Sequence, residues 1–162
     1  MADTAVTSPH WLLGPAVPDD VTTPERLTDE HQLIRQTTRD FMRQDVLPHL
    51  DALDAKDWTR ARTMLRGCGE LGLLGVDVPE AYGGVALDTV SSLIVAEEVA
   101  ANASFATTFG AMTGLAILPL LLFGTDDQRA RYLPRLVTGE LVGAYALSEA
   151  TSGSDALGAR TR

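Results

Sequence analysis

The sequence is poor in cysteine and in aromatic residues. Cys68 is the only cysteine among 162 residues, and aromatic side chains make up 6% of the chain. One thiol excludes an internal disulfide and any zinc site built from several cysteines, and it fits a reducing compartment. We expect Cys68 to be a small buried apolar residue. Hydrophobic residues reach 45% and charged residues 22%, which is typical of a folded globular protein.

Positive charge is also scarce. Lysine and arginine total 13 against 22 aspartates and glutamates, so the net charge is −9. This charge repels phosphate backbones and anionic lipid headgroups, so we expect no nucleic-acid partner. The amino terminus has no basic segment before its short apolar stretch HWLLG, which does not fit a signal peptide. We therefore expect a cytoplasmic protein.

No charge at all occurs from Val99 to Thr125, a run long enough to raise the question of a membrane helix. Polar residues, Gly110, Gly114 and Pro119 dilute and divide this run. The pattern therefore favours two successive helices buried in a protein core over a membrane span. The membrane protein is kept as the less favoured alternative.

The titratable residues form no recognisable catalytic or metal-binding pattern. His10, His31 and His49 are scattered without the spacing of metal ligands or of a triad, and we expect them at the surface. Glu97 and Glu98 are adjacent on an expected helix, where side chains point about 100° apart. We expect one to face solvent and the other an ion pair, without a shared site. The sequence thus offers no catalytic residue and no metal site.

Helical periodicity dominates residues 27–143 and predicts five to six helices with few strands, an all-α domain. Residues 1–26 are rich in Pro, Ser, Thr and Asp, and we expect a flexible arm there. Leu141–Glu149 mixes β-forming and small residues and is expected to be an extended strand or loop. Helices are expected to begin near Thr28 or Asp29, Thr59, Asp88 and Asp126. Expected inward side chains include Leu33, Ile34, Thr37, Phe41, Met42, Ala61, Met64, Leu65, Val90, Leu93, Ile94, residues 96–99, Tyr132, Leu133, Leu136 and Val137.

The stretch GCGELG, Gly67–Gly72, has the spacing of a dinucleotide-binding fingerprint but the wrong surroundings. That fingerprint requires a strand before it and a helix after it. Here a helical, arginine-rich segment precedes the glycines, and Pro79 with Gly83 and Gly84 follows them. We interpret the stretch as a glycine-rich helix end.

The strongest candidate for a ligand loop lies near the carboxyl end of the sequence. Four hydroxyls fall within seven residues, those of Ser148, Thr151, Ser152 and Ser154. Gly153 would let the backbone turn and present N–H groups to an oxyanion. The alternative is an ordinary Ser/Thr/Gly-rich turn in which Asp155 is a cap.

The segment ALSEATSGSDALG, Ala146–Gly158, resembles the signature of the acyl-CoA dehydrogenase family. It departs from that signature at Ala150, where most members carry proline, and this loss loosens the loop without removing a polar contact. The resemblance covers residues 28–162 and continues upstream in LGLLGVDVPEAYGG, AEEVA and FGTDDQRARYLPRLVTGELVGAYALSE. It implies an N-terminal helical domain that ends in an extended flavin-loop segment. In the family a middle β-domain and a C-terminal helical bundle follow, with FAD between the domains.

The resemblance also implies roles for individual residues. Tyr145, Leu147 and Ser148 are expected to lie against the flavin ring as cofactor-binding residues. Gly153 and Ser154 are expected to bind the cofactor pyrophosphate or the acyl-CoA, which makes Ser154 the substrate-binding candidate as well. Glu149 is expected to be structural and to orient the loop.

In this family a glutamate of the C-terminal bundle usually removes the α-proton of an acyl-CoA thioester, and a hydride passes from the β-carbon to the flavin. The resemblance therefore implies an oxidoreductase of fatty acid metabolism, with an acyl-CoA thioester as substrate. LGARTR resembles the start of the first strand of the β-domain, so residues 144–162 are expected to hold the loop and the beginning of a truncated β-domain. We expect the chain alone to be inactive, with a homo-oligomer or a partner subunit supplying what it lacks. The alternative is a non-catalytic helical module that binds a partner subunit.

Overall fold

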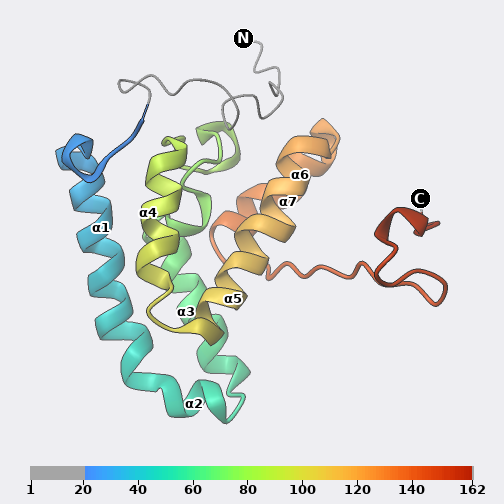
Figure 1. Ribbon diagram of the computed structural model, residues 1–162, viewed down its shortest axis with the longest axis horizontal. Helices are drawn as coiled ribbons and strands as arrows, with labels where there is room; N and C mark the ends of the chain where they lie inside the picture. The colour runs from blue at the N-terminus through green and yellow to red at the C-terminus, as the bar shows by residue number, and fades with distance from the viewer. Residues whose placement is uncertain (1–20, 162) are drawn as a thin grey trace.

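The computed structural model describes residues 21–161, and helices make up its body (Figure 1). The α-helices are α1 (Asp29–Phe41), α2 (Leu50–Asp54), α3 (Trp58–Glu70), α4 (Thr89–Val99), α5 (Ala103–Gly110), α6 (Leu118–Phe123) and α7 (Asp126–Val137). The 3-10 turns are η3 (Pro24–Arg26), η5 (Leu47–His49), η6 (Leu73–Gly75), η7 (Glu80–Tyr82) and η9 (Ala156–Gly158), and the π-helical segments are η4 (Met42–Val46) and η8 (Ala111–Ile117). No strand occurs within residues 21–161, so the all-α prediction is confirmed.

Side-chain caps begin the longer helices where the sequence indicates them. Thr28 caps α1 by accepting from the His31 amide, and Asp88 caps α4 by accepting from the Ser91 amide. α3 begins one residue earlier than predicted because Asp57 caps it. An unpaired first-turn amide costs free energy, so these oxygens fix the point at which each helix starts.

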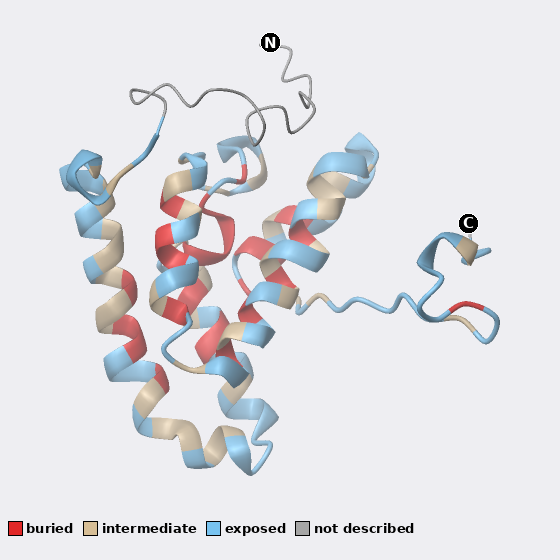
Figure 2. Ribbon diagram, in the orientation of Figure 1, coloured by how far each residue is buried: buried red, intermediate tan, exposed pale blue. Residues whose placement is uncertain are grey.

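The core lies between the helices, where buried residues gather on the inward faces (Figure 2). About half of the predicted inward side chains are buried and several more are partly buried, but Ala96 and Glu97 are exposed, Leu33 is 67% exposed and Leu93 is 64% exposed. Tyr132 is likewise exposed, at 36%. Leu33, Leu93 and Tyr132 each precede a better-buried neighbour by one position, and adjacent helical residues point about 100° apart. The width of the covered helix face decides whether both members of an apolar pair are buried, since Leu33 is exposed beside Ile34 whereas Met64 and Leu65 are both buried.

The charge-free run does not form two buried helices as predicted. Ala103–Phe123 is one continuous helix made of α5, η8 and α6, and only 22% of its most apolar window is buried. Pro119 does not break it, because the π-helical segment directly before this residue shifts the backbone hydrogen bonds, with the Leu118 amide donating to the Thr113 carbonyl. By length and composition this helix could cross a membrane, which by itself is weak evidence for a membrane span.

The three glycines of GCGELG serve helix packing, as the interpretation of a glycine-rich helix end requires. A Cβ on Gly67 would lie 2.9 Å from the Phe41 ring, and a Cβ on Gly69 would collide with the backbone of Thr138. Gly72 ends α3 in the left-handed region with φ +74°. The spacing therefore has a structural cause and no nucleotide needs to be invoked.

After α7 the chain leaves the helical body as an extended segment (Figure 1). Gly139 turns the chain with φ +71°, and the Gly143 amide contacts the Met112 sulfur at 3.2 Å. The sequence predicts an extended strand or a loop for Leu141–Glu149, and the structure shows a loop. The strand expected from Leu157 onwards does not form in the described residues. Ala156–Gly158 is instead a 3-10 turn, in which the Gly158 amide donates to the Asp155 carbonyl.

Candidate functional site

The predicted cofactor-binding residues all lie on the segment that projects from the helical body (Figure 1). Tyr145 is 54% exposed and Leu147 43%, and Ser148, Gly153 and Ser154 are exposed too. The structure thus brings the five candidates together on one stretch of chain and leaves their side chains open. Within residues 21–161, no hydrogen bond joins Ala144–Ser148 to the helices.

A tight turn shapes the second half of this segment. Glu149 and Ser152 exchange two backbone hydrogen bonds, of 2.8 and 3.2 Å. The Ser152 hydroxyl is buried and donates to the Asp155 carbonyl. Gly153, which follows, lies in a bend of the chain as predicted and has no positive φ. A Cβ at Gly153 would meet nothing within 4 Å, so the glycine leaves open space beside the backbone.

Glu149 has the structural role that the sequence predicts. Its carboxylate accepts hydrogen bonds from the amide of Arg160 at 2.9 Å and from that of Thr161 at 2.8 Å. Hydrogen bonding from Thr161 and then from Arg160 holds the pKa of Glu149 below its usual value. This carboxylate therefore stays ionised and ties the two ends of the loop together.

Among the described residues, several backbone amides remain free inside the loop closed by Glu149, among them those of Ala150 and Thr151 and a consecutive run that begins at Gly153. Within residues 21–161, the N–H groups of Gly153, Ser154 and Asp155 donate no hydrogen bond. Exposed consecutive amides are groups that bind oxyanions such as phosphates. The loop can therefore offer an anionic group several donors at once.

Sequence reasoning missed an apolar cavity of about 190 Å³ between α4, η6 and the long helix. Its lining includes Leu74, Val95, Val99, Phe109 and Leu118. The available signal was the set of small residues on the long helix, since Ala106, Gly110 and Gly114 line the cavity without filling it. The Ser92 hydroxyl also lines it and is buried with no hydrogen-bond partner in the part of the chain that the structure describes. Asp77 and Thr113 line the cavity as well, and an apolar space with a few polar groups is typical of a binding pocket.

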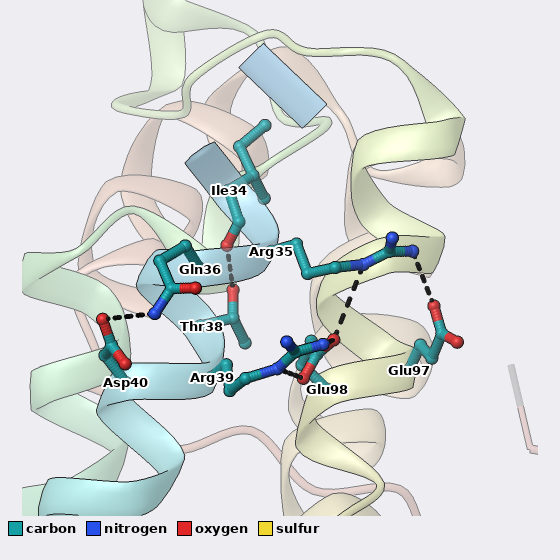
Figure 3. Close-up of polar contacts among 8 residues, drawn as sticks. All are labelled: Ile34, Arg35, Gln36, Thr38, Arg39, Asp40, Glu97 and Glu98. Carbon is teal, nitrogen blue, oxygen red and sulfur yellow. Dashed lines mark hydrogen bonds and ion pairs between the residues drawn. The ribbon is translucent and has the colours of Figure 1, made fainter. Parts of the chain in front are cut away.

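The adjacent glutamates differ in exposure as predicted, since Glu97 is 67% exposed and Glu98 is 12% exposed in an ion pair, but one arginine also joins them. The Arg35 guanidinium contacts both, with Nη2 3.0 Å from Oε2 of Glu97 and Nε 3.6 Å from Oε1 of Glu98 (Figure 3). The arginine side chain is long enough to reach both carboxylates, although adjacent helical residues point about 100° apart. Both carboxylates are therefore in ion pairs that join α4 to α1.

His31 is not a surface residue, contrary to the prediction. Its side chain is 12% exposed, Nδ1 lies 3.2 Å from the Thr28 amide, and Nε2 lies 3.2 Å from the Asp88 carboxylate. The ring thus links the caps of α1 and α4, a structural role. Residues 21–161 contain no group of three His, Cys, Asp or Glu side chains that could hold a metal, and His10 lies outside the described residues.

Comparison with known proteins agrees with this architecture. The family model described as acyl-CoA dehydrogenase, N-terminal domain, matches residues 28–140. A probable acyl-CoA dehydrogenase of Bacillus subtilis is 46% identical over 151 residues, which are 93% of this chain and 25% of that protein. The crystal structure of an acyl-CoA dehydrogenase complexed with FAD from Bacillus anthracis superposes with a TM-score of 0.87 at 49% identity, over 93% of this chain and 26% of that one.

More distant relatives share the fold as well. The glutaryl-CoA dehydrogenase of Mycobacterium smegmatis has a TM-score of 0.75 at 30% identity, over 85% of this chain and 36% of that one. The chain thus spans about a quarter to a third of the length of these relatives. Its helices, their order and the matched residues show that it belongs to the acyl-CoA dehydrogenase family, with the fold of the family's N-terminal domain.

Proposed function

We propose that this chain forms the N-terminal part of a flavin-dependent acyl-CoA dehydrogenase, which oxidises the Cα–Cβ bond of an acyl-CoA thioester. The observation that carries the proposal is the exposed loop Tyr145–Asp155 with several free amides, in a chain of this family. A similar protein of this family, from Bacillus anthracis, has been crystallised with FAD. A cytoplasmic location remains part of the proposal.

The loop fits FAD in its donors and in its open space. The free amides of Gly153 and Ser154 would hold the negatively charged pyrophosphate or the acyl-CoA, and the absence of a side chain at Gly153 leaves room for it. Tyr145, Leu147 and Ser148 would lie along the isoalloxazine ring, with apolar surface and a hydroxyl exposed to it. When bound, FAD supplies the hydride acceptor for the oxidation.

The apolar cavity between α4, η6 and the long helix fits part of the acyl group. Its lining is dominated by aliphatic side chains with Phe109, and its volume of about 190 Å³ suits a short aliphatic segment. Asp77, Ser92 and Thr113 give that segment a few polar neighbours, of which the Ser92 hydroxyl is buried and unpaired within the described residues. Burying an aliphatic chain there would remove apolar surface from water, which is the main driving force available at this site.

We further propose that the chain alone is inactive. An α-proton must be removed by a base within hydrogen-bond reach of substrate. Within residues 21–161 the partly buried carboxylates already have partners, since Asp40 accepts from Gln36, Glu98 binds Arg39, and Glu149 accepts from two amides. None of them is free to accept a proton from a thioester.

Titration of the purified chain with FAD tests the cofactor proposal. We expect quenching of flavin fluorescence and a rise in melting temperature, with no oxidation of a short-chain acyl-CoA. Turnover by the chain alone would contradict the proposed inactivity. Absence of both quenching and thermal shift would contradict FAD binding by this chain.

The second candidate, a non-catalytic module that binds a partner subunit, rests on the exposed side of the long helix. Leu115, Leu118, Leu122 and Phe123 are 46%, 39%, 56% and 84% exposed. Apolar side chains gathered in this way are typical of a surface that another protein covers. Co-purification of a partner without flavin would favour this candidate, and light scattering would reveal a homo-oligomer.

A further inference from the structure

We infer that Glu149 is a positioning residue, which closes the loop Glu149–Thr161 and thereby presents the free amides of Gly153–Asp155 to the cofactor. This inference rests on the proposed function, because FAD is the ligand assigned to the loop. Glu149 itself would act through the loop and not on flavin or substrate, because each of its carboxylate oxygens already accepts an amide hydrogen from Arg160 or Thr161.

The closure depends on contacts that are far apart in the sequence. Glu149 reaches Arg160 and Thr161 across 11 and 12 residues, and each of its carboxylate oxygens accepts one amide hydrogen. Inside the loop, the turn from Glu149 to Ser152 and the Ser152 hydroxyl on the Asp155 carbonyl fix the approach to Gly153. Apart from these contacts, few interactions hold this exposed segment, so losing the carboxylate would let its ends separate.

The charge of Glu149 makes the assignment testable. A free carboxylate beside the amides would repel the pyrophosphate of FAD, because like charges at close range disfavour binding. Here two backbone amides solvate the carboxylate, so the loop keeps a negative residue while binding an anion. Neutralising Glu149 therefore changes the affinity for FAD in opposite directions, depending on whether the residue positions the loop or contributes only its charge. It weakens FAD binding if Glu149 positions the loop, and it strengthens FAD binding if Glu149 contributes only its charge.

Glu149→Gln, Glu149→Asp and the wild-type chain should be compared by amide hydrogen exchange and by FAD titration. In wild type we expect slowed exchange at Arg160 and Thr161, and in Glu149→Gln faster exchange at both with shifted resonances at Gly153, Ser154 and Asp155. FAD binding should weaken about tenfold in Glu149→Gln, because the amide offers one acceptor oxygen and no charge. Glu149→Asp, which keeps the charge and both oxygens, should restore part of the affinity. Asp127→Asn removes one charge from the exposed first turn of α7 and is the matched control.

Three outcomes would overturn the positioning role of Glu149. Unprotected amides at Arg160 and Thr161 in wild type, or unchanged loop resonances in Glu149→Gln, would overturn the positioning role. Tighter FAD binding by Glu149→Gln would also overturn it. If wild type shows the protected amides but does not bind FAD, the cofactor proposal fails for this chain, while the exchange data still establish that Glu149 closes the loop.

Discussion

Glu98 on α4 accepts two hydrogen bonds from Arg39 on α1, with Nε 2.9 Å from Oε2 and Nη2 2.6 Å from Oε1 (Figure 3). The Glu98 side chain is 12% exposed and that of Arg39 is 40% exposed, so the pair lies at the edge of the interface between the helices. Two parallel charge-assisted bonds fix the relative position of the helices more strictly than apolar packing does.

Replacing Glu98 by Gln should lower the free energy of unfolding by about 1–2 kcal/mol, because the Arg39 guanidinium loses its charged partner in partly buried surroundings. Glu97→Gln is the matched control, since Glu97 is 67% exposed and contacts only Arg35. Its effect should stay below about 0.5 kcal/mol. Urea unfolding of both variants at neutral pH measures the difference. Equal losses would show that exposure does not decide the strength of these pairs.

Acid should destabilise the fold in a defined direction. Hydrogen bonding from Arg39 lowers the pKa of Glu98 below its usual value of 4.5, and hydrogen bonding from Ser91 lowers that of Asp88 below 3.8. A carboxylate whose pKa is lower in the folded state stabilises it fully above the unfolded pKa. That contribution is lost as pH falls through the folded pKa.

We therefore expect the free energy of unfolding to decline from pH 4.5 downwards and to stay flat above it as far as these two groups contribute. Urea titrations across this range measure the decline, and Glu98→Gln should reduce its slope because one of the titrating groups is gone. An unchanged slope in that variant would contradict the assignment to Glu98.

Gly69→Ala should destabilise the protein by about 1–3 kcal/mol, because the new methyl group collides with the Thr138 backbone and forces α3 away from the end of α7. Gly110→Ala is the matched control. It also lies within a helix, but a Cβ there meets nothing within 4 Å. Its higher helix propensity should stabilise by about 0.5–1 kcal/mol. Thermal unfolding of the two variants should thus shift in opposite directions, and shifts in the same direction would refute the packing explanation.

Cys68 should be inert toward thiol reagents while the protein is folded. Burial raises the pKa of its thiol to about 12, so almost no thiolate exists at pH 8, and no reagent can reach the sulfur. We expect modification with an aromatic disulfide reagent to be slow in buffer and complete within the mixing time in denaturing urea. Rapid stoichiometric labelling of the native chain would disprove the buried position.

Gly153→Val should leave stability unchanged within about 0.5 kcal/mol, because the added side chain enters open space. It should weaken FAD binding about tenfold or more, because the same open space is where the pyrophosphate would approach the amides. Fluorescence quenching measures affinity, and thermal unfolding supplies the control for folding. An unaltered affinity for FAD would contradict the assignment of Gly153 to the cofactor site.

Much of the fold could be predicted from local sequence. Helical periodicity and cap residues such as Thr28 and Asp88 act within one turn, so the positions of α1 and α4 could be placed to within a residue or two. The end of α3 at Gly72 and the loop conformation of Ala144–Ser148 follow from equally local preferences. The loop signature predicted the family, and the comparisons confirm it.

Contacts between distant residues could not be predicted in the same way. Whether Leu33 is covered depends on which helix packs beside α1, and whether one arginine reaches both Glu97 and Glu98 depends on the separation of α1 and α4. The long helix continues through Pro119 after a π-helical segment, and no local sequence pattern predicted that segment.

The sequence by itself determined the helical class, the family and the residues of the candidate loop, because caps, periodicity and a contiguous motif are local properties. Only the tertiary structure decided what those residues do together. It placed His31 between two helix caps, left an apolar cavity beside Ser92, and turned the Glu149 carboxylate onto two amides more than ten residues away. Each of these depends on the distance between elements remote in sequence, which is set by packing of the whole chain.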